Sequence, residues 1–310
     1  MAGRTRKIIS AVMAALMIMA AGGCGSSNKE IPSSADNSRY VSETKDNGNV
    51  TDGKEYDIDN GGLPYDEETV YNQLFDINNK VEIDVNISDD ELAKMQSDYN
   101  RYDNMGSKSP IYRKCDLKIS ITSDGVKNTY IIRNTGIRMK GNTSRTAFYD
   151  SNSGVYSLIH FKVDFTETFD DEQYYGGDSD YDLDIDKEKQ QNRTFATLDS
   201  MEIKWNQTSD STYVREYYAC EMYRDFGILA QRTNLASINL GDVHEGIFKI
   251  YEPVDKKFIK RYVAEEDRGG DLYKCGWTRN GATFLTNVSY GIEDKENRNC
   301  LLYTSDAADE

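Results

Sequence analysis

Several stretches of the chain alternate apolar and polar residues with a period of two, the pattern of half-buried strands. The clearest is VEIDVNI at residues 81–87, where every second residue is aliphatic. A Ser-Asp-Gly sequence at 123–125 interrupts a longer alternating stretch and predicts a tight turn between two strands. Strands are therefore expected within segments 81–87, 115–141, 158–165, 235–240 and 246–252.

Helix signals occur at three places between these strands. Ser88 is followed three residues later by Glu91, a capping box that opens a short helix over residues 88–99. Asp210 and Ser211 precede a second helix, residues 212–226, which a glycine ends. A third, charged helix is expected over residues 255–266. Strands, one helix and then two more strands predict an α+β architecture.

The helix predicted over residues 212–226 has one apolar face. At 100° per residue, Val214, Tyr218, Met222 and Phe226 form a stripe along it. Arg215 falls inside this stripe, and a charge directed at a core requires a partner. We therefore expect Arg215 to form a buried ion pair that fixes the helix to the sheet; the alternative is a side chain that extends past Tyr218 to solvent.

The N-terminal residues predict an export signal and a tether. Segment 1–23 has a basic start and a short apolar run, and it ends in small residues before Cys24, like a bacterial lipobox. We expect cleavage before Cys24, lipidation of its thiol and attachment to the outer face of the cell membrane; an ordinary signal peptide with a chance cysteine is the alternative. Residues 24–66 contain almost no large apolar residue and predict a disordered acidic stalk.

Composition narrows the range of functions. The net charge is −16, so binding to nucleic acid is disfavoured because phosphate backbones need clustered Lys and Arg. Cys115, Cys220 and Cys275 match no zinc spacing, and an odd number of cysteines leaves at most one disulfide and a spare thiol. The sequence therefore favours a folded exported domain without a disulfide framework.

An acidic insertion carries aspartate at every second position from Asp178 to Asp186. Such alternation suggests a calcium loop, but Leu183 stands where an EF-hand needs glycine and Lys189 where it needs a bidentate glutamate. A solvated acidic insertion is the favoured interpretation, and no metal-binding residue is assigned.

Three stretches in order resemble the spore-coat protein CotH family, an extracytoplasmic branch of kinase-like folds. They are GIRMKGNTSR at 136–145, SDSTYVREYYACEMYRDFG at 209–227 and GDVHEGIFKIYEPVDKKFIKRY at 241–262. The resemblance extends over residues 71–299. It implies a kinase-like small lobe, a twisted antiparallel sheet with one packed helix, followed by only the start of a large lobe. The domain is expected at residues 67–299.

The resemblance also implies a nucleotide site. Phosphoryl transfer needs cations on the phosphates, and Arg138, Lys140 and Lys162 are the candidates; solvated strand side chains are the alternative. Asn142 caps a turn in this interpretation, or is an ordinary turn residue. Glu252 holds the hinge between lobes or meets the adenine, or else is a surface carboxylate. His160 is interpreted as a strand residue rather than a catalytic base.

The family relation implies that the intact protein is a cell-surface lipoprotein with atypical Ser/Thr protein kinase activity. It would use ATP with Mg or Mn to phosphorylate extracellular proteins. A Lys-Lys-Pro-Tyr run usual in the family reads Ser-Leu-Ile-His at 157–160, which puts the identity of the phosphate-side lysine in doubt. The alternative function is a non-catalytic surface binding or assembly module.

The last residues predict a truncation. In the family, the metal-binding and acceptor-positioning aspartates follow the hinge, and neither Trp205 nor Trp277 is followed by the expected aspartate. CLLYTSDAADE, residues 300–310, resembles the translation of a transposon-end sequencing adapter at every position. We therefore expect an adapter-derived tail on a fragment that lacks catalytic residues, needs no cofactor and is inactive.

Overall fold

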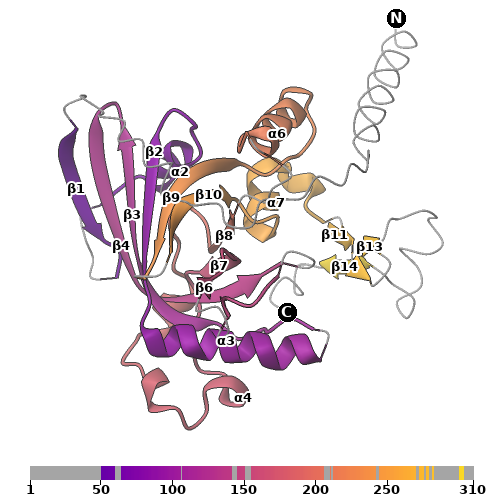
Figure 1. The fold of residues 1–310 in the computed structure, drawn as a ribbon. Helices are drawn as coiled ribbons and strands as arrows, with labels where there is room; N and C mark the ends of the chain where they lie inside the picture. Colours follow the sequence, from indigo (N-terminus) through magenta and orange to yellow (C-terminus); the bar gives the residue numbers. More distant parts are fainter. Residues whose placement is uncertain are drawn as a thin grey trace, which may run out of the picture. The chain divides into compact units, whose positions relative to one another are not determined.

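The structure is a computed structural model of the chain, and it describes residues 50–59, 64–105, 107–141, 145–150, 155–205, 210, 212–241, 244–269, 272–275, 277–278, 281–282 and 300–303. Its central feature is a mixed sheet that closes into a seven-stranded barrel with an eighth strand at one edge (Figure 1). The α+β class is confirmed. The barrel strands are β2 (Lys80–Asn86), β3 (Arg113–Ser123), β4 (Val126–Lys140), β7 (His160–Asp164), β8 (Ser200–Trp205), β9 (Thr233–Leu240) and β10 (His244–Tyr251).

The barrel closes because β4 pairs with two different sets of partners along its length. It pairs with β3 as far as Ile137, its first half also pairs with the edge strand β1 (Thr51–Asp57), and its end pairs with β7 from Gly136 to Lys140. The pairing of β3 with β4 shifts between Cys115 and Leu117, a bulge that bends the ladder. At that bulge Asn134 has a φ of 47°, and its backbone N–H donates to Asp116 at 2.9 Å.

The predicted twisted antiparallel sheet is corrected in two respects, because the sheet closes into a ring and is mixed rather than purely antiparallel. Neighbouring strands are antiparallel around the ring except for β2 and β9, which run parallel. Strand β1 lies inside the segment predicted as a stalk, and Tyr56 of β1 is buried against the aromatic side chains of Tyr65 and Tyr130. Residues 51–57 therefore belong to the folded domain.

The barrel interior is a continuous apolar core. Alternate residues of each strand point inward, as the period-two pattern predicted. Among the largest buried side chains are Phe161, Phe248, Ile83 and Leu117. Burial of such side chains contributes about 1.5–3 kcal/mol each, so the core supplies much of the folding free energy.

Local signals in the sequence placed several element ends correctly. The Asp124-Gly125 turn joins β3 to β4, with both residues at positive φ as a two-residue hairpin requires. Ser88 caps helix α3 (Asp89–Asn104) by accepting the backbone N–H of Glu91 at 3.3 Å. Gly227, at a φ of 73°, ends helix α6 (Arg215–Asp225).

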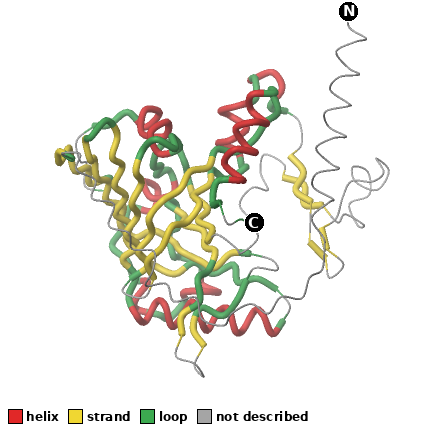
Figure 2. Tube along the Cα trace, turned by 45° about the horizontal axis from the view of Figure 1, so that its top comes forward, coloured by secondary structure: helices red, strands yellow, loops and turns green. Residues whose placement is uncertain are grey.

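The expected packing of α6 is wrong. None of its residues is buried, and Tyr218 and Phe226 of the predicted apolar stripe are 63% and 69% exposed. In Figures 1 and 2 this helix lies at one side of the barrel, where it approaches β9. Val214 and Met222 of the stripe are only partly buried, so the stripe does not pack into the core as predicted.

The acidic insertion is more ordered than predicted. It forms α4 (Glu172–Tyr175), the 3₁₀ turn η2 (Ser179–Tyr181) and α5 (Lys187–Gln191). Asp178 and Asp180 are ion-paired with Lys94 of α3 at 2.8 and 2.9 Å, and Tyr181 is buried. Among the described residues, no group of three or more His, Cys, Asp or Glu side chains could hold a metal ion.

The remaining elements are short. Helix α2 (Glu67–Leu74) contributes Tyr71 and Leu74 to the core, and α7 (Lys256–Tyr262) follows β10. Within the described residues, no helix is both long and apolar enough to cross a membrane. Cys115 and Cys220 are free thiols. The other elements are η3 (Glu265–Asp267), β5 (Tyr149–Asp150), β6 (Val155–Tyr156), β11 (Leu272–Cys275), β12 (Trp277–Thr278), β13 (Gly281–Ala282) and β14 (Cys300–Tyr303).

Candidate functional site

One outer wall of the barrel carries basic side chains from four neighbouring strands, β4, β7, β8 and β10. Because the apolar residues of these strands point inward, the residues between them share the outer face. Arg138 lies opposite Lys162, Lys162 opposite Glu202, and Glu202 opposite Tyr251. We call this surface the strand wall; it consists of Arg138, Lys140, His160, Lys162, Glu202, Lys204, Lys249 and Tyr251.

Glu202 organises the centre of the strand wall. Its carboxylate forms an ion pair with Lys140 of β4 and lies 3.6 Å from the Nζ of Lys204, its neighbour on β8. The Lys204 ammonium also lies 3.9 Å from the ring centroid of Tyr251, a cation–π contact. Two lysines are thus held side by side by one carboxylate, with side chains about a third exposed (30% and 31%).

Arg138 and Lys162 form the other end of the strand wall, beside Tyr112. The Arg138 guanidinium lies 4.9 Å from the Tyr112 ring centroid, and its Nη1 donates to the carbonyl of Ser109 at 3.1 Å. Burial lowers the pKa of Lys162, but Tyr112 and Asp164 outweigh it, so this pKa lies above its usual value. Lys162 is therefore charged, and both side chains are partly screened from solvent.

The most buried cation on the strand wall is Lys249. Its Nζ lies 2.6 Å from a carboxylate oxygen of Glu216 in α6 and 3.7 Å from Asp210. The Tyr251 hydroxyl also donates to Glu216. Burial raises the pKa of Glu216, but the bonds from Lys249 and Tyr251 outweigh it, so this pKa lies below its usual value. Glu216 is therefore ionised, and it connects α6 to the barrel.

Arg215 does not have the predicted role. Its side chain is 68% exposed, and its Nε lies 4.0 Å from Asp210, so it is not a buried ion-pair partner. The next residue, Glu216, makes the contact between helix and sheet instead. The prediction of a buried ion pair rests on the position of Arg215 in the apolar stripe, but no residue of α6 is buried.

Glu252 lies at the end of β10, where the sequence placed a hinge. Its carboxylate is fully buried and ion-paired with Arg261 of α7, so the surface interpretation is wrong. It also accepts from the Tyr262 hydroxyl and from the backbone N–H of Arg232, each at 3.3 Å. Burial raises the pKa of Glu252, with Arg261 opposing this effect. These bonds all hold the strand end to α7 and β9.

Two predicted site residues cannot be placed. Asn142 and Cys24 lie outside the described residues, so turn capping and lipidation stay predictions. Lys140 and Lys162 are brought onto one face with Arg138, as the strand pattern indicated. The sequence missed Lys204 and Glu202 because residues 200–205 were not recognised as a strand. It also missed Lys249, although the alternation in GIFKIYE places this lysine on the other face of the strand from the buried Phe248 and Ile250.

Two buried side-chain nitrogens on the strand wall lack hydrogen-bond partners among the described residues. They are the Nε of Arg138 and the Nδ1 of His160. Buried polar atoms are nearly always hydrogen-bonded, so unpartnered atoms beside several cations favour an oxyanion ligand. The wall therefore fits phosphate groups. It does not fit a divalent metal, because no suitable cluster of ligands occurs in the described part of the chain.

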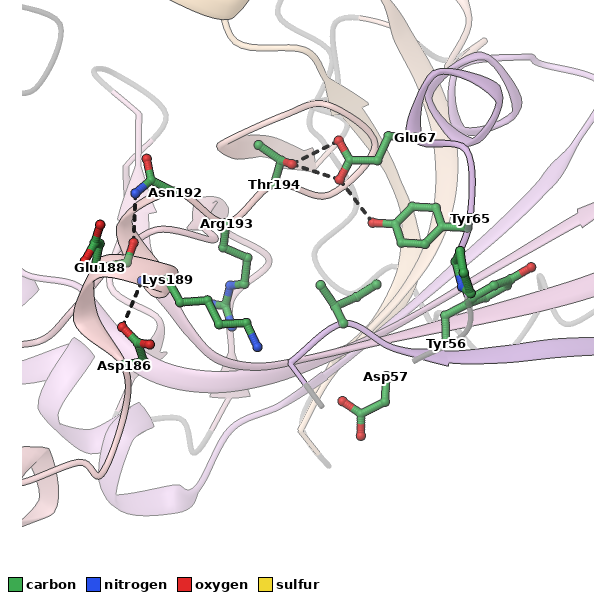
Figure 3. Close-up of a pocket in the computed structure, with 12 residues that line it drawn as sticks. Tyr56, Asp57, Tyr65, Glu67, Asp186, Glu188, Lys189, Asn192, Arg193 and Thr194 are labelled. Carbon is green, nitrogen blue, oxygen red and sulfur yellow. Dashed lines mark hydrogen bonds between the residues drawn. The ribbon is translucent and has the colours of Figure 1, made fainter. Parts of the chain in front are cut away.

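A separate cavity of about 630 Å³ lies near the end of β1, the start of α2 and helix α5. As Figure 3 shows, several of its polar side chains are already bonded: Thr194 donates to the Glu67 carboxylate, and the Asn192 amide donates to the backbone carbonyl of Glu188. Arg193 donates to Asp59 and to the carbonyls of Phe165 and Arg133. Few groups there remain to bind a ligand, so we place the candidate site at the strand wall.

These features define a mixed α+β domain with a cationic, phosphate-suited wall and a lysine that a helical glutamate holds in position. The family model for CotH kinase protein matches residues 177–307. The resemblance to the CotH family is therefore confirmed over this part of the chain. The match covers Lys204, Glu216, Lys249 and Glu252; the motif at 136–145 lies before it and stays a prediction. No curated protein matches the chain.

The matched range reaches into residues 300–310, which the sequence suggests derive from an adapter. Residues 300–303 form β14, which pairs with β11. The adapter origin of this segment stays a prediction.

Proposed function

We propose that the strand wall binds the phosphates of ATP. In this proposal the intact protein is a CotH-type cell-surface lipoprotein that transfers phosphate to Ser or Thr of extracellular proteins. The observation that carries the proposal is the ion pair between Lys249 of β10 and Glu216 of α6, at 2.6 Å. Protein kinases require a comparable pair between a strand lysine and a helix glutamate to position the nucleotide phosphates.

The chemistry of the strand wall suits this task. A phosphate group is bound best by donors that are charged and already held in place. Glu216 orients Lys249, and Glu202 orients Lys140 and Lys204, so these ammonium groups lose little side-chain entropy when an anion binds. Arg138 and Lys162 extend the same cationic face toward β4 and Tyr112.

The divalent metal implied by the family would neutralise phosphate charge when bound, but the described residues do not provide its ligands. The proposal therefore concerns phosphate binding by the protein's own cationic side chains. We expect this chain to bind nucleotide weakly and to transfer no phosphate. Attachment to the outer face of the cell membrane through Cys24 is part of the proposal.

The test is the affinity for a fluorescent ATP analogue of the wild-type chain and a Lys249→Met variant. One charge-assisted hydrogen bond is worth about 1.5–3 kcal/mol, so Lys249→Met should weaken binding about 10- to 100-fold. The matched control is Lys118→Met, because Lys118 is an exposed lysine of β3 on another part of the barrel. Glu216→Gln tests the positioning role with a half-exposed side chain and should weaken binding by a smaller factor.

Equal affinity of wild type and Lys249→Met would contradict the assignment, as would equal losses for Lys249→Met and Lys118→Met. Circular dichroism of each variant shows whether the fold is retained. A wild-type chain that binds no nucleotide would favour the alternative of a non-catalytic binding or assembly module.

A further inference from the structure

His160 occupies a position on the strand wall that the proposed function does not use. It begins β7 and lies opposite Lys140 of β4. Its side chain is partly buried, and its Nδ1 is fully buried with no hydrogen-bond partner among the described residues. A buried ring nitrogen without a partner is unfavourable, so a ligand group that bonds to it would stabilise this arrangement.

The charges around His160 come from four elements. Lys140 of β4, Lys204 of β8 and Lys249 of β10 all repel a proton on the imidazole. Glu216 of α6 attracts one. Glu202 of β8 is ion-paired with Lys140 and close to Lys204, and so offsets part of their charge. The imidazole therefore lies among three ammonium groups whose carboxylate partners are directed at the lysines.

We propose that His160 is a positioning residue that donates a hydrogen bond to a phosphate on the strand wall, and that phosphate binding is coupled to protonation of its imidazole. This proposal rests on the proposed function of the wall. A protonated imidazole has two N–H donors, and a phosphate offers several oxygen acceptors for them. The proton that the imidazole gains on phosphate binding comes from solvent, so no bond of the phosphate ligand breaks.

The electrostatics agree with this geometry. Burial, followed by the charge of Lys204, lowers the pKa of His160 to about 4. A polyphosphate bound between the lysines reverses the local sign of the potential and stabilises the imidazolium. By linkage, an upward pKa shift of one unit means that the anion binds the protonated protein tenfold more tightly.

The chain allows a direct test because it contains two histidines, His160 and His244. The imidazole signals of the full chain, labelled with ¹³C-histidine, are followed by NMR from pH 5 to 8, with and without saturating pyrophosphate. A His244→Gln variant leaves a single signal and assigns it. Without pyrophosphate, His160 should stay neutral over this range. With pyrophosphate, we expect its pKa to rise by at least one unit.

An unchanged His160 titration with pyrophosphate bound, or no pyrophosphate binding, would overturn this inference. A His160→Gln variant should bind pyrophosphate with less dependence on pH between 5 and 7 than wild type, whereas a purely structural histidine would change affinity equally at all pH values. A parallel titration with ATP separates the two proposals. Pyrophosphate binding coupled to protonation without ATP binding would contradict the proposed function alone, and ATP binding without a shift of His160 would contradict this inference alone.

Discussion

At the scale of single residues, the buried carboxylate of Glu252 shows how one charge fixes two elements. Arg261 neutralises it and also lies over the Tyr71 ring, 3.9 Å from its centroid. Removal of one partner of a buried ion pair costs about 3–5 kcal/mol, because the other charge is left uncompensated. Arg261→Met should therefore lower the free energy of unfolding by about that amount, measured by urea denaturation.

The pH dependence of Arg261→Met follows from the same residue. Burial already raises the pKa of Glu252, and loss of Arg261 raises it further. A carboxyl whose pKa is raised by folding stabilises the folded state most below its unfolded pKa, about 4.3. That contribution to stability is lost as the pH rises through the pKa of the folded state. Arg268→Met is the control, because the bonds that Arg268 makes within the described residues are exposed ones to the carbonyls of Val263 and Lys260. If Glu252→Gln added to the Arg261→Met variant does not restore stability, the uncompensated charge of Glu252 is not the cause of the loss and the explanation is wrong.

Residue-scale inference from sequence succeeded where the strand pattern was local. Arg138, Lys140 and Lys162 share a face because alternation dictates it. It failed at Arg215, where the wheel correctly described an apolar stripe but could not show which face meets the barrel. One position further along, about 100° around the helix, Glu216 makes the contact with Lys249.

At the scale of elements, the acidic insertion is attached to α3 through Lys94. The Nζ of Lys94 contacts Asp178, Asp180 and Glu91 at 2.8, 2.9 and 3.3 Å. Its replacement by methionine leaves three carboxylates close together without a cation. Lys94→Met should lower global stability by only about 1 kcal/mol, because these pairs are partly exposed. It should, however, release the insertion, so limited proteolysis should cut between residues 176 and 188 faster than in wild type.

The control for this prediction is Lys80→Met, which removes an exposed ion pair with Glu82 on β2. That variant should show the wild-type pattern of cleavage. Unchanged cleavage of Lys94→Met would mean that the aromatic contacts among Phe169, Tyr175 and Tyr181 hold the insertion without the ion pairs.

Element ends were predictable where one residue type meets a specific backbone need. The left-handed turn at Asp124-Gly125, the Ser88 cap and the Gly227 stop are of this kind. The sequence also showed that the insertion is acidic, but it did not predict that the insertion is attached to α3. Glu91, predicted as half of a capping box, is instead buried and accepts from the backbone N–H of Lys114 at 3.1 Å and from the Tyr181 hydroxyl at 2.5 Å. Such partners lie far away in sequence, and no periodicity indicates them.

At the scale of the whole molecule, the closed barrel depends on pairings that local patterns cannot specify. The parallel pairing of β2 with β9 joins strands about 150 residues apart, and the pairing of β4 with β7 completes the ring. Strands β1 and β8 were absent from the prediction; β1 is rich in polar residues. The sequence thus predicted a twisted antiparallel sheet without its closure, although most of its strands were located correctly.

Barrel closure also depends on the bend of β4 at Asn134, and this gives a prediction about global stability. Asn134 has a φ of 47°, a conformation that glycine adopts freely and a β-branched residue does not. Asn134→Val should cost about 1–3 kcal/mol, because the strained backbone there must be held against the ladder with β7. Asn134→Gly, which removes the same side chain without that strain, should cost less. Urea denaturation of both variants provides the measurement, and equal losses would show that the Asn134 side chain, rather than the backbone bend, is what the closed barrel requires.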